Sequence, residues 1–100
     1  MKNVKIYTGY KEFYRDFFHD IDRATRSIYL EFAIVEEDSI GHQLKKKLIQ
    51  KSLKGIDVRF VYDGFTTRLS KRFIGELEIS GVKTFNFKSL HYRKFSFRAT

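Results

Sequence analysis

The spacing of apolar residues changes several times along the chain, and each change marks a new structural element. Between about residues 10 and 26, apolar side chains recur every three or four positions, as on one face of a helix. They are Phe13, Phe17, Ile21 and Ala24. Residues 27–35 then form a nearly unbroken apolar run. That run predicts a central strand of a parallel sheet, covered on both faces.

The middle of the chain repeats this alternation of helix and strand. A second apolar stripe begins after Asp38 and Ser39, whose short side chains can cap the free amides of a helix. It ends at Gly55, which suits the left-handed residue that closes a helix. Residues 56–62 predict the next strand, and the helix after it ends at Gly81.

Strands are also expected near both ends of the chain, at residues 4–7 and 82–87. Alternating strands and helices of this length predict an α/β fold. We expect one domain over residues 1–100, with a mainly parallel sheet of about four strands flanked by helices. Residues 88–100 are an uncertain tail that fits either a further strand or an unfinished segment.

Composition excludes several classes of protein. Hydrophobic residues make up 42% of the chain and aromatic residues 17%, which argues for a packed domain and against disorder. The absence of Cys excludes disulfides and thiolate metal sites. No apolar run approaches the roughly 20 residues that cross a bilayer, and the start lacks the apolar stretch of a signal peptide. We therefore expect the chain as given to be soluble, although it can be a piece of a longer protein.

Positive charge is the strongest compositional bias. The formal net charge is +8, and no acidic residue follows Glu78. A basic surface attracts the phosphates of lipid headgroups or nucleic acid. The alternative interpretation is that the charge serves only solubility.

Acidic residues are the first candidates for a site, because an open parallel sheet binds ligands at the carboxyl ends of its strands. Glu31 lies within the expected strand, where its charge needs either a partner such as Arg59 or a functional role. Asp38 is expected mainly as a helix cap. Asp63 follows the next strand and either caps the turn before the third helix or points into a site.

Histidines and known motifs add little chemistry. His19 and His42 fall on expected helix surfaces, and His91 lies among basic residues. A lone His needs a partner for acid–base or nucleophilic work. The chain has no Gly-rich phosphate loop, no Gly-x-Ser-x-Gly and no His-Glu-x-x-His. We predict neither a metal nor a cofactor.

Four segments, taken in order, carry a family resemblance. Residues 30–41 run from an apolar strand through an acidic turn into Ile-Gly, and residues 55–63 read Gly-Ile-Asp-Val-Arg-Phe-Val-Tyr-Asp. Residues 69–73 and 81–86 continue the series. Together with the upstream helix, this order resembles the cardiolipin synthase type of the phospholipase D superfamily, over about residues 10–87.

The family's signature, His-x-Lys-x4-Asp, is missing from the chain. In the family one such His attacks phosphorus and forms a phosphohistidine, another acts as general acid, and the Lys residues hold phosphate oxygens. Here the residues two places after each His are Ile21, Leu44 and Arg93. We therefore assign no catalytic residue. Either the chain ends before the motif, which we favour, or the motif has been lost.

The resemblance implies a parent enzyme that joins two phosphatidylglycerols into cardiolipin and glycerol at the cytoplasmic face of a membrane, without a metal or organic cofactor. In that parent, Arg93 and Lys94 would join Glu31, Asp38 and Asp63 in the wall of a headgroup pocket. A phospholipase D-like nuclease and a non-catalytic module that binds phosphate or an anionic surface are the alternatives. Without the family's partner half, the chain is expected to form a homodimer.

Overall fold

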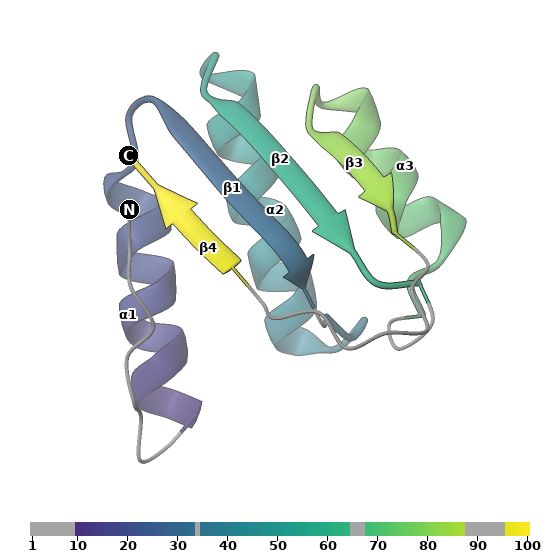
Figure 1. The fold of residues 1–100 in the computed structure, drawn as a ribbon, viewed down its shortest axis with the longest axis horizontal. Coiled ribbons are helices and arrows are strands. Elements are labelled where there is room, and N and C mark those ends of the chain that lie inside the picture. Colours follow the sequence, from purple (N-terminus) through teal and green to yellow (C-terminus); the bar gives the residue numbers. More distant parts are fainter. Residues whose placement is uncertain (1–9, 34, 65–67, 88–95) are drawn as a thin grey trace.

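A computed structural model describes residues 10–33, 35–64, 68–87 and 96–100. The four strands form one sheet in the order β3-β2-β1-β4, and three helices lie on one side of it (Figure 1). In chain order the elements are α1 (Tyr10–Arg23), β1 (Ser27–Ala33), α2 (Ser39–Leu53), β2 (Asp57–Tyr62), α3 (Lys71–Ile79), β3 (Lys83–Asn86) and β4 (Ser96–Ala99). The predicted α/β class and mainly parallel four-stranded sheet are confirmed.

The sheet is parallel in its centre and antiparallel at one edge. β2 pairs in parallel with both β1 and β3, whereas β4 runs antiparallel to β1. β1 and β2 are central, as their apolar runs predicted. The expected strand at residues 4–7 lies outside the described residues. The fourth strand is β4, from the tail whose structure the sequence pattern left open.

The edge strand β4 makes an aromatic contact with the helical layer. Phe97 lies opposite Leu30 in the register, and its ring packs against Phe17 of α1 at a centroid distance of 4.6 Å. Within the described part of the tail, Phe97 and Ala99 therefore join the apolar side of the sheet. This contact gives an otherwise polar segment an apolar reason to pair with β1.

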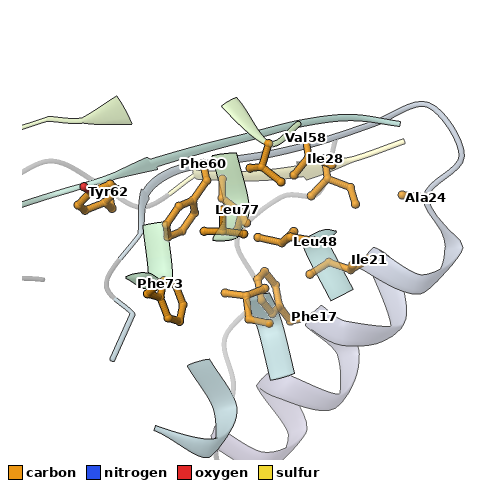
Figure 2. Close-up of a cluster of buried hydrophobic side chains, with 13 residues drawn as sticks. Phe17, Ile21, Ala24, Ile28, Leu48, Val58, Phe60, Tyr62, Phe73 and Leu77 are labelled. Atoms are coloured by element: carbon orange, nitrogen blue, oxygen red, sulfur yellow. The ribbon is translucent and has the colours of Figure 1, made fainter. Parts of the chain in front are cut away.

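The core lies between the sheet and the helices (Figure 2). Because strand side chains alternate between faces, β2 sends Val58, Phe60 and Tyr62 towards the helices. They meet buried residues of all three helices, among them Phe17, Ile21, Leu44, Leu48, Phe73 and Leu77.

The expectation that β1 is covered on both faces is wrong for the described part of the chain. Alternate residues of β1 and β2 lie on the face away from the helices, where Glu31 and Arg59 are exposed and Tyr29 and Asp57 are half-buried. The apolar run misled because Tyr29, which counts as hydrophobic, has a polar end that reaches Asp57 on this face. We call this surface the open face.

The helix ends at Asp38, Gly55 and Gly81 follow the predicted signals, whereas the cap of α3 is a residue that the pattern did not single out. The Asp38 side chain caps α2 by accepting from the Gly41 amide at 2.8 Å. Ser70 caps α3 by accepting from the Phe73 amide at 3.1 Å, so Asp63 is not the cap of that helix. Gly55 and Gly81 follow α2 and α3 with φ of 88° and 97°, in the left-handed region that favours glycine.

Candidate functional site

A pocket of about 380 Å³ opens where β1 ends, between α1 and the start of α2. The residues that line it come from both helices, from β1 and from the turn between β1 and α2. They are Phe13, Tyr14, Phe17, Leu30, Val35, Glu36, Asp38, Ile40, Gly41 and Leu44. The pocket therefore lies at the carboxyl end of a central parallel strand, the position at which ligands bind open α/β sheets.

Aromatic rings of α1 form the apolar part of this pocket. The Phe13 and Phe17 rings stack at 5.6 Å with an interplanar angle of 10°, one helical turn apart. Leu44 of α2 is buried beside them and belongs to the core. These side chains are fixed by the packing of the core, so the apolar part of the pocket is preformed.

Three polar side chains give the pocket its chemistry. Tyr14, Glu36 and Asp38 line it together with the apolar residues. Burial raises the pKa of the Tyr14 hydroxyl, and the negative charges of Asp38 and Glu36 raise it further. The hydroxyl is therefore protonated at neutral pH and can donate a hydrogen bond. The pocket combines one donor and two carboxylate acceptors with an apolar wall.

The acidic turn that carries these carboxylates is closely packed. A Cβ on Gly41 would lie 1.8 Å from the Glu36 carbonyl oxygen, so only glycine fits at this position without movement of the turn. The Gly41 amide also donates to the Asp38 carboxylate. The Ile-Gly pair at the start of α2 is therefore a steric requirement of the acidic turn.

Glu37, the middle residue of the turn, points to another helix. Its carboxylate accepts a hydrogen bond from the Ser70 amide just before α3. That hydrogen bond is the main reason why the pKa of Glu37 lies below its usual value. Glu37 thus ties the turn to the start of α3, while its neighbours Glu36 and Asp38 line the pocket.

The structure separates the acidic residues that the sequence grouped together. Asp38 caps α2 and also lines the pocket. Asp63 is partly buried directly after β2, but it does not line this pocket. Glu31 is exposed on the open face, and its expected partner Arg59 instead pairs with Asp57 at 3.3 Å. Of the two interpretations left open for Glu31, the pairing with Arg59 is therefore not found among the described residues.

The remaining candidates divide into exposed residues and residues outside the description. His19 and His42 are exposed, as expected for helix surfaces. Arg93 and Lys94, together with His91, lie outside the described residues. Within residues 10–33, 35–64, 68–87 and 96–100, no group of His, Cys, Asp and Glu could hold a metal ion. In the same part of the chain, no helix is long and apolar enough to span a membrane.

Tyr14 is the pocket residue that the sequence pattern did not single out. It lies beside the Phe13–Phe17 face of α1 and reads as one more aromatic core residue. The hydroxyl of Tyr14 is the only feature of the sequence that points to a polar role, since buried Tyr hydroxyls usually find a polar partner. The acids that face it are more than 20 residues away in sequence.

Comparison with known proteins gives one consistent group of relatives. The chain is 39% identical over 85 residues to a cardiolipin synthase of Geobacillus sp. (strain WCH70), covering 84% of this chain and 17% of that protein. It is 41% identical over 86 residues to a cardiolipin synthase of Halalkalibacterium halodurans, covering 85% of this chain and 17% of the relative. Cardiolipin synthase 2 of Bacillus cereus is 40% identical over 85 residues, which cover 84% of this chain and 16% of that protein.

These matches concern one segment of longer proteins, because the chain spans about 17% of the length of the curated relatives it matches. No family model matches the chain, and no solved structure matches it significantly. The relatives share one name and cover the strand, acidic turn and helix that carry the resemblance noted above. Over most of its length the chain is therefore homologous to a segment of the cardiolipin synthases.

Proposed function

We propose that the chain acts as part of a longer phosphatidyltransferase that joins two phosphatidylglycerols into cardiolipin and glycerol. The observation that carries this proposal is identity of 36–41% to several cardiolipin synthases over more than 80% of the chain. The pocket at the end of β1 supports it, because its chemistry fits the glycerol end of a lipid headgroup.

The fit follows from the donors and acceptors of a glycerol headgroup. Its hydroxyls can donate to the carboxylates of Glu36 and Asp38 and accept from the Tyr14 hydroxyl. Its carbon skeleton can contact the Phe13 and Phe17 rings. In the proposed site, these residues bind and orient the headgroup, and chemistry at phosphorus belongs to His-x-Lys-x4-Asp motifs that this chain lacks.

The headgroup phosphate needs positive charge near the pocket. We assign that role to Arg93 and Lys94, and we keep Asp63, after β2, as a second acceptor. Neither assignment follows from the described geometry. They rest on the family resemblance and on the absence of acids after Glu78.

The test is turnover of phosphatidylglycerol by the complete protein that contains this chain. Its products, cardiolipin and free glycerol, are measured together. Tyr14→Phe keeps the ring and removes the donor, so KM should rise about fivefold, the effect of one hydrogen bond of roughly 1 kcal/mol. Tyr62→Phe, at a buried core tyrosine outside the pocket, is the matched control and should leave KM unchanged.

Two outcomes would contradict the proposal. Cleavage of nucleic acid without cardiolipin formation would identify the parent as a nuclease. An equal rise of KM in both Tyr→Phe variants would show that the Tyr14 effect is one of stability and that this pocket does not bind the headgroup.

A further inference from the structure

A row of basic residues crosses the open face of the sheet. In the strand register, Lys83 of β3 lies opposite Arg59 of β2, Arg59 opposite Tyr29 of β1, and Tyr29 opposite Arg98 of β4. One row across all four strands thus holds three cations and one aromatic ring. Neighbouring strands lie about 4.8 Å apart, so the row is roughly 14 Å long. We call these four residues the cationic row.

Contacts within the row hold its side chains in place. The guanidinium carbons of Arg59 and Arg98 lie 4.7 and 4.8 Å from the centre of the Tyr29 ring. The Tyr29 hydroxyl donates to the Asp57 carboxylate at 2.8 Å. The ring and its two guanidiniums are therefore ordered together, which lowers the entropy lost when the guanidiniums bind a ligand.

Charge within the row is only partly neutralised. Asp57 contacts Arg59 at 3.3 Å and Lys83 at 3.4 Å, so one carboxylate serves two cations. Among the described residues, Arg98 has no carboxylate within ion-pair distance. Like charges opposite one another in a sheet are destabilising. The described strands carry two acids on this face, Asp57 and the exposed Glu31, so the three cations still exceed them, which fits an external anionic partner.

The shape of the surface helps to identify that partner. The row lies on a sheet surface with no described element above it, and Phe85, 59% exposed, lies two residues after Lys83 on the same strand. Single-stranded nucleic acid binds sheets by stacking bases on free aromatic rings. The Tyr29 ring is already occupied by the two guanidiniums, so within the row itself only the cations remain to bind a ligand. A plane of phosphates fits the row better.

We propose that the cationic row docks this chain on an anionic lipid surface, with phosphatidylglycerol vesicles as the probe. Arg98 and Arg59 bind headgroup phosphates, Lys83 adds a third contact, and Phe85 enters the interface beside it. This surface is distinct from the pocket at the end of β1, which opens between the helices. The inference concerns binding alone and does not depend on phosphatidyl transfer.

The test measures co-sedimentation of the chain with vesicles of phosphatidylglycerol and, separately, of phosphatidylcholine. Arg59→Gln/Arg98→Gln should weaken binding to phosphatidylglycerol about thirtyfold, since each basic residue near an anionic surface contributes roughly 1 kcal/mol. Arg15→Gln/Arg23→Gln removes the same charge from α1, on the other side of the sheet, and should change binding less than about twofold. Arg98→Gln alone should weaken binding to phosphatidylglycerol about fivefold, and it leaves the contacts of Asp57 intact.

Several results would overturn the proposal. Equal losses in the two double variants would assign binding to the whole positive surface. If Arg93→Ala/Lys94→Ala weakened vesicle binding and Arg59→Gln/Arg98→Gln did not, the binding surface would be the tail and not the cationic row. Inorganic phosphate that displaces the chain at constant ionic strength would indicate a site for a small anion. If the chain bound a single-stranded oligonucleotide more tightly than the vesicles, and Arg59→Gln/Arg98→Gln abolished that binding, the partner of the row would be nucleic acid instead.

Discussion

Two helical glycines illustrate how local packing decides the effect of a single methyl group. At Gly41 an added Cβ would lie 1.8 Å from the Glu36 carbonyl oxygen, whereas at Gly75 in α3 it would meet nothing within 4 Å. We expect Gly41→Ala to destabilise the fold by about 1–3 kcal/mol, because the acidic turn must move. Gly75→Ala should stabilise it by about 0.5–1 kcal/mol. Urea unfolding of both variants is the measurement, and a stable Gly41→Ala variant would contradict the described turn.

Asp57 is one residue through which the stability of the fold depends on pH. The Tyr29 hydroxyl, with help from Arg59 and Lys83, holds the pKa of Asp57 below its ordinary value of 3.8. A carboxyl with a depressed pKa adds stability above its unfolded pKa and loses that contribution as the pH falls through the folded value. Asp57→Asn should therefore lower Tm at pH 6. On acidification, the Tm of this variant should fall by less than the Tm of the wild type. Parallel Tm–pH curves for the two proteins would disprove the contribution.

At the scale of elements, β4 is one of the two edge strands of the sheet. It is an edge strand, paired only with β1, and Phe97 gives its aromatic contact with α1. Phe97→Ala should cost about 1–3 kcal/mol of local stability, because the ring is only partly buried. Hydrogen exchange should show faster exchange of the β4 amides while β2, in the centre, stays protected. Equal acceleration in β2 and β4 would mean that the edge does not open independently.

Most elements could be predicted because their signals are local. The apolar spacing of α1, the cap at Asp38 and the glycines at 55 and 81 each depend on neighbouring residues. The open face could not be predicted in this way. Tyr29 counts as apolar in any pattern, and only the register of four strands shows that it stands between Arg59 and Arg98.

The candidate site was predictable only in part, for the same reason. Sequence order gave the acidic turn and the role of Asp38 as a cap. It could not show that Tyr14 reaches the same pocket, since α1 and the turn meet only in the folded chain. For Glu31 it left a pairing with Arg59 and a functional role open, whereas the structure pairs Arg59 with Asp57, two residues away on the same strand and face.

At the scale of the whole molecule, the exposed apolar residues bear on association. Leu53 and Ile79 are 70% and 90% exposed at the ends of α2 and α3. These ends lie close together, because Ser52 donates to the Ser80 carbonyl at 2.8 Å. We predict that the chain forms a homodimer that covers this patch. Light scattering should show a dimer that Leu53→Ser/Ile79→Ser converts to monomer, and a wild-type monomer at millimolar concentration would refute it.

The central claim is that this chain, which lacks the catalytic motif, is a working segment of a cardiolipin synthase. We expect the purified chain alone to turn over no phosphatidylglycerol beyond a heat-treated control. The chain should nevertheless support cardiolipin formation when it replaces the matching segment of a complete enzyme. The direct test replaces the matched 85 residues of the Geobacillus sp. (strain WCH70) cardiolipin synthase with those of this chain.

Cardiolipin formed by the chimera from phosphatidylglycerol is the decisive measurement, with the amount of folded chimera matched to the unmodified enzyme. The account predicts that the chimera retains at least roughly a tenth of the parental rate, a barrier change within about 1.4 kcal/mol. A folded chimera that forms no cardiolipin, or a purified chain that forms it unaided, would contradict the account.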